Sequence, residues 1–292
     1  MQSIRYIDIN NRIISNKIEI LFPYWNERNE RICILSPHDD DAIIGAGYVI
    51  SAAVKSGIEV FIIMFTIGDL GYSNISQKNN IVEIRRQETL KAYKRIGIKE
   101  ENIIRFNYSD LSLFRLIGWM PEDNIKGCFK DIITILRKLK ITRLLIPNHY
   151  RENLDHHALS IIGAYDMPYV GDPVFVDWGD PYKISSILEY SVWSDLAPED
   201  AIICKRKANL RANKIIIVSQ DIEREVCAGI SDFKSQGDII KGLIESRKER
   251  VDSNGNYIEV YLAFDPRPKL DFKPYINFIN NIESDSSKIK DK

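Results

Sequence analysis

Cysteine and histidine are scarce in this chain of 292 residues, which contains four of each. The spacing C-x-x-C, which is typical of structural zinc sites and redox motifs, does not occur. The cysteines are instead scattered over most of the chain, at Cys33, Cys128, Cys204 and Cys227. We therefore predict reduced thiols in the core, and neither a disulfide framework nor a zinc site made of cysteines.

An excess of charge of one sign and long apolar runs are also lacking. The net charge of −1 excludes the basic surface that nucleic acids and anionic membranes require. The longest apolar runs, such as the one at 60–65, are far shorter than the ~20 residues of a membrane span. Residues 1–8 show no signal-peptide pattern. With 45% hydrophobic and 28% charged residues, we expect a cytoplasmic globular protein, and the composition leaves homo-oligomerisation open.

Strand-like and helix-like segments alternate along the chain. Short apolar runs typical of buried strands lie at 31–35, 59–66, 102–107 and 143–147, and helical patterns lie at 42–55, 81–96, 125–140 and 156–165. This alternation predicts an α/β fold, a Rossmann-like and mostly parallel sheet with helices on both faces. We expect further strands at 184–192 and 214–218 and a helical region at 221–250. No linker-like stretch interrupts the pattern, so we predict a single domain over 1–282 and a polar tail over 283–292.

All four histidines fall in two short segments that are rich in carboxylates. One segment is Ser36-Pro37-His38-Asp39-Asp40-Asp41, and the other is His149-Tyr150-Arg151-Glu152-Asn153-Leu154-Asp155-His156-His157. Each follows a predicted strand and precedes a predicted helix, and such turns meet at one edge of a parallel sheet. A mononuclear zinc hydrolase needs about three mixed ligands, an open position for water and a nearby carboxylate to accept a proton. These two segments together offer all of these groups.

The same segments resemble signatures of a known family, the PIG-L/LmbE-like deacetylases. The stretch from Pro37 to Gly47 resembles the family's PHxDD(E/A)xxGxG signature, and the stretch from Asn153 to His156 resembles its (H/N)xDH signature. Supporting similarities lie at Arg85 to Gly97 and at Asp110, and weaker, unspecific ones lie at 190–193, 234–236 and 257–259. The resemblance implies a zinc-dependent hydrolase that removes the N-acetyl group from an N-acetylglucosamine-type amino sugar.

The resemblance also implies a role for individual residues. His38, Asp41 and His156 match the family's metal ligands, so we expect one zinc ion per chain; the aspartate ligand leaves Fe(II), Co(II) or Ni(II) usable. Asp40 matches the general base. The residues expected to contact the sugar are Arg85, Asp110 and Asn153.

Three positions depart from the family pattern. Asp39 replaces a frequent proline at a tolerant position, so we expect its substitution to have little effect, and Ala42 replaces a frequent glutamate. Asn153 stands where many members carry histidine and cannot carry a proton at neutral pH. Either His149 therefore acts as the catalytic acid, or Asp40 handles both proton transfers. His157, next to a ligand on the same helix, is expected to be solvated.

Structural roles and other functions are the alternatives to this interpretation. An aspartate-rich turn is often a helix N-cap, Arg85 and Glu88 have the spacing of a helical ion pair, and Gly45 and Gly47 suggest close packing more than nucleotide binding. The chain is alternatively a zinc amidase for another N-acyl or thiol-conjugate substrate, or a non-catalytic sugar-binding descendant. Asp40 argues against the last, because a binding protein needs no base. The Pro- and Gly-containing segment 167–181 is the expected substrate loop.

Overall fold

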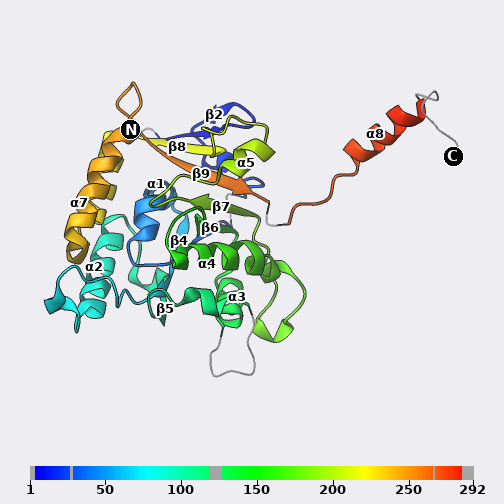
Figure 1. Cartoon of the computed structure of the whole chain (residues 1–292). Coiled ribbons are helices and arrows are strands. Elements are labelled where there is room, and N and C mark those ends of the chain that lie inside the picture. The colour runs from blue at the N-terminus through cyan, green and yellow to red at the C-terminus, as the bar shows by residue number, and fades with distance from the viewer. Residues whose placement is uncertain (1–3, 27–28, 119–126, 266, 285–292) are drawn as a thin grey trace.

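A computed structural model describes residues 4–26, 29–118, 127–265 and 267–284. In these residues nine strands form one sheet, in the order β2-β1-β8-β9-β7-β6-β3-β4-β5 (Figure 1). The strands are β1 (Arg5–Asp8), β2 (Ile13–Ser15), β3 (Arg31–Ser36), β4 (Glu59–Thr66), β5 (Ile103–Tyr108), β6 (Arg143–Pro147), β7 (Ser186–Tyr190), β8 (Lys214–Val218) and β9 (Tyr257–Phe264).

The sheet is mixed, so the prediction of a mostly parallel, Rossmann-like sheet is not confirmed. Neighbouring strands from β7 to β5 run parallel, whereas β2, β1, β8 and β9 pair with their neighbours in antiparallel fashion. The sequence did not predict β1, β2 or β9. Since β9 lies between β7 and β8 and runs antiparallel to both, β8 runs in the same direction as β7, and strand directions alternate from β7 to β2.

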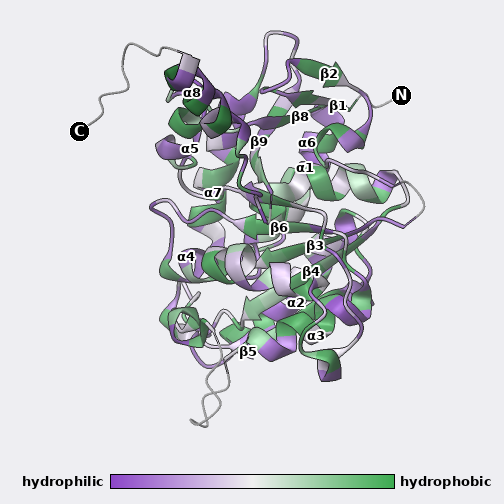
Figure 2. Ribbon diagram, turned by 90° about the vertical axis from the view of Figure 1, so that its right-hand side faces the viewer, coloured by the Kyte–Doolittle hydropathy of each residue, from purple (hydrophilic) through white to green (hydrophobic). Residues whose placement is uncertain are grey.

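Helices cover both faces of the sheet, as predicted for an α/β fold. They are α1 (Asp41–Lys55), α2 (Ile81–Arg95), α3 (Phe129–Leu139), α4 (Leu154–Ile161), α5 (Pro198–Ile203), α6 (Gln220–Ile230), α7 (Gly237–Ser246) and α8 (Lys273–Ser284). Alternate side chains of β3 point to opposite faces because a strand has a period of two. Ile32 and Ile34 join a core with α1 and α6, and Cys33 and Leu35 join a second core with α3 and α4. Figure 2 shows the hydrophobic residues along the inner strands and the helix faces that cover them.

The predicted helix boundaries need small corrections. The helix predicted at 156–165 begins at Leu154 and ends at Ile161, and a π-helical turn follows at Ile162–Asp166. The helix predicted at 125–140 spans Phe129–Leu139, and residues 125–126 lie outside the described part of the chain. Glu283 and Ser284, predicted to lie in the polar tail, still belong to α8, and residues 285–292 lie outside the described part.

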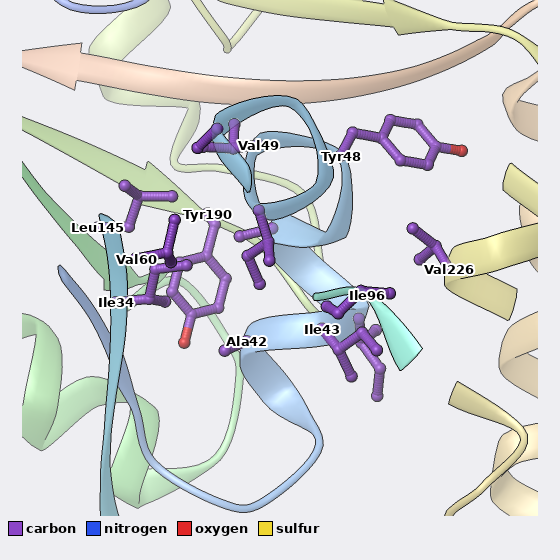
Figure 3. Packing of buried hydrophobic residues seen from close by; sticks show 14 of the residues in the cluster. Ile34, Ala42, Ile43, Tyr48, Val49, Val60, Ile96, Leu145, Tyr190 and Val226 are labelled. Carbon is purple, nitrogen blue, oxygen red and sulfur yellow. The ribbon is translucent and has the colours of Figure 1, made fainter. Parts of the chain in front are cut away.

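Helix α1 is broken one turn after its start. Ala46 has non-helical dihedral angles (φ −134°, ψ 20°), and it lies between two glycines, a common cause of kinks. A Cβ atom on Gly45 would lie 2.4 Å from Cδ2 of Tyr190, and one on Gly47 would lie 2.6 Å from Cγ1 of Val226. In Figure 3, α1 runs between strand residues on one side and Val226 of α6 on the other. The close packing of helix on strand predicted for the two glycines is thus confirmed for Gly45, whereas Gly47 packs against helix α6.

Two buried charged residues satisfy the backbone groups that the break releases. Arg247 donates a hydrogen bond from Nη1 to the carbonyl oxygen of Ile44 (3.0 Å), and the backbone N–H of Tyr48 donates to Oε2 of Glu259 (3.0 Å). Arg247 also pairs with Glu259 at 3.3 Å. The first turn of α1 is therefore held in place by two residues that follow α7 in the sequence, Arg247 and Glu259 of β9.

Helix α8 lies apart from the sheet and its covering helices (Figure 1). All of its residues are exposed, including the apolar side chains of Tyr275, Ile276 and Ile279. Within the described residues, no helix has both the length and the apolar composition to cross a bilayer. All four cysteines are free, as predicted. Cys33 and Cys128 are buried, but Cys204 is exposed and so is not a core thiol.

Candidate metal centre

Two strand-to-helix turns form the site, and they lie at the same edge of the sheet. The first joins β3 to α1 and carries His38, and the second joins β6 to α4 and carries His156. Because β3 and β6 are parallel neighbours, their carboxyl ends lie side by side. The convergence predicted for the two histidine segments is present in the structure.

Three side chains meet at this edge with the composition of a metal site. One ligand atom each from His38, Asp41 and His156 lies within 4.8 Å of the others. Oδ2 of Asp41 lies 3.0 Å from Nδ1 of His38 and 3.1 Å from Nε2 of His156. Two imidazoles and one carboxylate form a donor set that suits zinc and other divalent transition metals.

The environment of His156 supports a cation between these groups. Nδ1 of His156 lies 2.6 Å from Oε2 of Glu152, a hydrogen bond that puts the proton on Nδ1 and leaves a lone pair on Nε2. In the described residues, the buried Nε2 has no hydrogen-bond partner, although the Asp41 oxygen is close. Two lone pairs that face each other across 3.1 Å repel, and a metal ion or a proton between them removes that repulsion.

The shifted pKa values of the three groups indicate a site that favours a bound cation. Burial lowers the pKa of His156, but the Asp41 carboxylate outweighs it and raises that pKa to about 9. The pKa of His38 is raised for the same reason, again against the effect of burial. Burial would raise the pKa of Asp41, but His156 and His38 hold it well below its usual range. A metal ion must therefore displace protons from this site, so we expect it to bind more tightly as pH rises.

Two further carboxylates orient the histidines. Oδ2 of Asp155 lies 3.3 Å from Nε2 of His38, which leaves Nδ1 of His38 facing Asp41. Oε1 of Glu152 accepts the backbone N–H of Val192 (2.8 Å) and of Trp193 (3.0 Å). Glu152 thus joins a ligand histidine to the loop that follows β7. The role of Glu152 was not predicted, although its position four residues before His156 is a signal in the sequence.

Asp39 and Asp40 have different environments. Asp39 is fully buried, with Oδ2 2.9 Å from Nε of Arg85 and a close ion pair with Arg105, so its predicted tolerance to substitution does not fit this environment. Asp40 lines the site and lies 3.1 Å from Nη2 of Arg85. Burial raises the pKa of Asp40, Arg85 lowers it and Asp41 raises it, and the result is a raised pKa. Such a carboxyl group is suited to proton transfer.

A cavity of about 260 Å³ opens above these groups. This volume is just below the ~300–1,000 Å³ typical of small-molecule sites. The cavity brings together most of the residues that the sequence analysis singled out. It is lined by His38, Asp40, Asp41, Leu70, Gly71, Arg85, Asp110, Leu111, Asn153, Trp193, Gln236 and Ile239.

The three expected sugar-binding residues all line this cavity, but each already has a partner in the protein. The guanidinium of Arg85 is paired with Asp39 and Asp40. Asp110 accepts the backbone N–H groups of Gly68 and Leu70, at 3.0 and 3.1 Å. Oδ1 of Asn153 accepts the backbone N–H of Asp155 (2.8 Å) as the N-cap of α4, which leaves its amide N–H groups for other contacts.

His149 and the expected substrate loop lie elsewhere. His149 is not among the cavity-lining residues of the described chain, and its Nδ1 lies 3.5 Å from Oε1 of Glu189. His157 is exposed, as predicted. Segment 167–181 also contributes no lining residue among those described. The Arg137 guanidinium holds it in place by donating to six of its carbonyl groups, those of Tyr169, Val170, Asp172, Val174, Phe175 and Gly179.

Comparison with known proteins supports the family resemblance inferred from the motifs. The family model described as PIG-L, GlcNAc-PI de-N-acetylase, matches residues 33–164, the part of the chain that contains both metal segments. A diacetylchitobiose deacetylase of Thermococcus kodakarensis is 25% identical over 172 residues, which are 56% of this chain. The match spans 60% of that relative's own length. The predicted resemblance to the PIG-L/LmbE-like family is thus confirmed.

Solved structures share the fold at lower sequence identity. The N,N'-diacetylchitobiose deacetylase of Pyrococcus horikoshii is similar with a TM-score of 0.63 and 22% identity, over 82% of this chain and 85% of that one. GalB of Pseudomonas putida, a 4-carboxy-2-hydroxymuconate hydratase, is similar with a TM-score of 0.59 and 15% identity, over 83% of this chain and 99% of that one. Proteins with different reactions therefore share this fold, so the reaction must be argued from the site.

Proposed function

We propose that this chain, which matches the PIG-L family model over residues 33–164, is a zinc-dependent hydrolase that removes the N-acetyl group from an N-acetylglucosamine-type sugar. One observation carries the proposal. Asp40, a carboxyl group with a raised pKa, lines the same cavity as His38 and Asp41, two of the three donors of the metal set. A base beside a metal set is the arrangement that hydrolysis needs and simple binding does not.

His38, Asp41 and His156 would hold the metal ion. When bound there, a zinc ion lowers the pKa of water to ~7 and polarises a carbonyl oxygen. Nδ1 of His38 and Nε2 of His156 face the site, because Asp155 and Glu152 occupy the other ring nitrogens. The two carboxylates thereby select the tautomer that each ligand requires.

Asp40 carries the proton transfers in this proposal. Its carboxylate accepts a proton from the attacking water, whose oxygen forms a bond with the acetyl carbonyl carbon. The same group then returns the proton to the nitrogen as the C–N bond breaks, and acetate and a free amine leave. Because the structure places His149 against Glu189 and outside the cavity lining, we favour Asp40 over His149 for both transfers. Arg85 would keep Asp40 ionised.

Asp110 and Asn153 would contact the sugar within the cavity that Asp40 also lines. Asn153 has free amide N–H groups, which suit a hydroxyl or carbonyl oxygen. Asp110 has two carboxylate oxygens, each already accepting one backbone N–H. Carboxylate oxygens can accept more than one hydrogen bond, so Asp110 can still bind a sugar hydroxyl.

Acetate release from N-acetylglucosamine and its glycosides by zinc-loaded protein tests the proposal. We expect Asp40→Asn to keep one equivalent of metal and to lower kcat roughly 10²–10⁴-fold, the usual effect of removing a general base. His156→Ala is expected to lose the metal. Release of a different acyl group, with none from N-acetylated sugars, would favour the alternative of another amidase. Sugar binding without any turnover would favour a non-catalytic descendant.

A further inference from the structure

The residues that line the cavity divide into a charged floor and an apolar rim. The floor includes Asp40, Asp41 and Arg85, which are at most 7% exposed. Four large apolar side chains also line the cavity but are 46–55% exposed, so they lie nearer its mouth. We call these four the apolar rim: Leu70, Leu111, Trp193 and Ile239.

Three of the four rim residues are held by carboxylates of the site itself. The backbone N–H of Leu70 donates to Asp110, at 3.1 Å. The backbone N–H of Leu111 donates to Asp155 at 2.6 Å, and that of Trp193 to Glu152 at 3.0 Å. Asp155 and Glu152 are the carboxylates that orient the ligand histidines, so the rim is fixed relative to the metal site.

The backbone conformation of Leu111 also indicates that its surroundings hold this rim residue in place. Its φ angle is +62°, in the left-handed region that residues other than glycine rarely adopt. Such a conformation persists only where the surroundings determine it, and it is frequent at functional sites. Here the hydrogen bond to Asp155 holds the backbone, and the leucine side chain remains half exposed at the mouth of the cavity.

The rim offers little to a charged or strongly hydroxylated group. Arg85 is the only arginine or lysine among the described lining residues, and it is already paired with two aspartates. Of the two neutral polar lining side chains, Gln236 donates its amide to the carbonyl of Gly71, and Asn153, whose Oδ1 caps α4, is assigned above to the sugar itself. Exposed apolar side chains that surround a polar pocket usually mark a place where apolar ligand surface is buried.

We propose that the apolar rim binds an uncharged apolar group, alkyl or aryl, attached to the amino sugar whose N-acetyl group lies on the charged floor. The inference rests on the proposed function and specifies its substrate class. The cavity of about 260 Å³ is small, so the remainder of a larger substrate must lie across the rim. A phosphate, a nucleotide or a second sugar ring would instead bring charges or hydroxyl groups, which favour water, against these four apolar side chains.

Matched glycosides test the proposal. We compare kcat/KM for acetate release from N-acetylglucosamine, from its methyl, butyl and hexyl β-glycosides, from its 1-phosphate and from N,N'-diacetylchitobiose. Each methylene that reaches the rim should raise kcat/KM about two- to fourfold, since burial of one is worth ~0.8 kcal/mol at most. The phosphate and the disaccharide should gain nothing. Trp193→Ala should flatten the alkyl series, because its backbone hydrogen bond to Glu152 survives while the apolar surface is lost.

A control and a binding measurement separate this proposal from the function on which it rests. Leu210→Ala removes an apolar side chain that is 49% exposed but does not line the cavity, and it should keep the full alkyl series. Equilibrium binding of the same glycosides to zinc-loaded Asp40→Asn protein reports on the rim without turnover. If no substrate releases acetate but hexyl glycosides still bind more tightly than methyl glycosides, the proposed reaction fails and the rim stands. Equal kcat/KM and Kd along the alkyl series would contradict the proposal that the rim binds an apolar group. A higher kcat/KM only for the phosphate or the disaccharide would contradict it as well.

Discussion

The pKa of the buried Asp40 carboxyl group is shifted in opposite directions by its neighbours. Burial and the neighbouring Asp41 raise its pKa, whereas the Arg85 guanidinium lowers it. In the proposed mechanism the base works only when it is deprotonated, so we expect the pKa of Asp40 to set the acid limb of the activity profile. We therefore expect the charge of Arg85 to determine how far activity extends into acidic conditions.

Replacing Arg85 tests this dependence. Arg85→Gln removes the positive charge, so the pKa of Asp40 rises further and the acid limb of kcat/KM moves to higher pH, by about one pH unit or more. Arg85→Lys keeps the charge and should move the limb much less. The measurement is kcat/KM across the acidic and neutral range with metal-loaded protein. An acid limb that stays in place in Arg85→Gln would show that Asp40 does not set it.

Glu152 is the second residue whose role can be tested alone. In Glu152→Gln the side chain can donate to Nδ1 of His156, which would move the ring proton to Nε2, the nitrogen that faces the metal site. We expect metal affinity to fall about 10- to 100-fold, as for other residues that orient a ligand histidine. Competition with a chelator measures this. Glu225→Gln, which removes the surface partner of Lys55, is the control and should leave affinity unchanged.

The sequence predicted the three residues that the structure brings together as a possible metal set, but it did not predict the role of Glu152. His38, Asp41 and His156 lie in short motifs directly after strands, and parallel neighbours bring such turns together. Glu152 was missed because its partners include backbone groups 40 to 42 residues further along the chain. The contact between Asp155 and His38 likewise joins residues 117 positions apart. No local pattern encodes such pairings.

At the level of single elements, the first turn of α1 has the least freedom to change. A Cβ atom on Gly45 would lie 2.4 Å from the Tyr190 ring and 2.8 Å from the carbonyl oxygen of Ser191. The carbonyl oxygen belongs to the backbone of the loop that Glu152 holds, so it cannot move aside cheaply. The glycine at this position is thus required by close approach.

Two glycine substitutions should have opposite effects. We expect Gly45→Ala to lower the free energy of unfolding by about 1–3 kcal/mol, the usual result of overpacking. Gly242 lies within α7, and a Cβ atom added to it would have no neighbour within 4 Å. Gly242→Ala should therefore raise that free energy by about 0.5–1 kcal/mol through better helix propensity. Urea unfolding measures both. A neutral Gly45→Ala would mean that Tyr190 and its loop adapt freely.

Elements of the parallel half were predicted more accurately than those of the antiparallel half. The bounds of β4 and β6 agree with the predicted segments, because continuous apolar runs mark buried strands. In the antiparallel half only β8 was predicted with its observed bounds. β1 and β2 have only four and three residues, too few for a periodic signal. β9 has eight residues, but its direction could not be predicted, because side chains alternate between the two faces in parallel and antiparallel strands alike. Strand direction depends on partners that the local sequence does not specify.

At the scale of the whole molecule, α8 contributes no buried residue to the rest of the fold. Ending the chain at residue 271 should therefore change Tm by less than about 2 °C, because exposed residues rarely contribute more than about 0.5 kcal/mol each way. Ending it at residue 256 removes β9 from between β7 and β8 and should prevent folding. Thermal unfolding followed by circular dichroism distinguishes these cases. A drop of more than about 5 °C for the first truncation would show that α8 packs against the rest of the fold.

The break in α1 has a consequence for the order of events during synthesis. The metal ligands span residues 38–156, so they have all been added when little more than half of the chain exists. The partners of the released backbone groups in the first turn of α1 are Arg247 and Glu259, which the ribosome adds about 100 residues later. A nascent chain that has all its ligands thus still lacks the groups that hold the Asp41 turn in place. Tight capture of the metal should accordingly be a late step, which follows the arrival of β9.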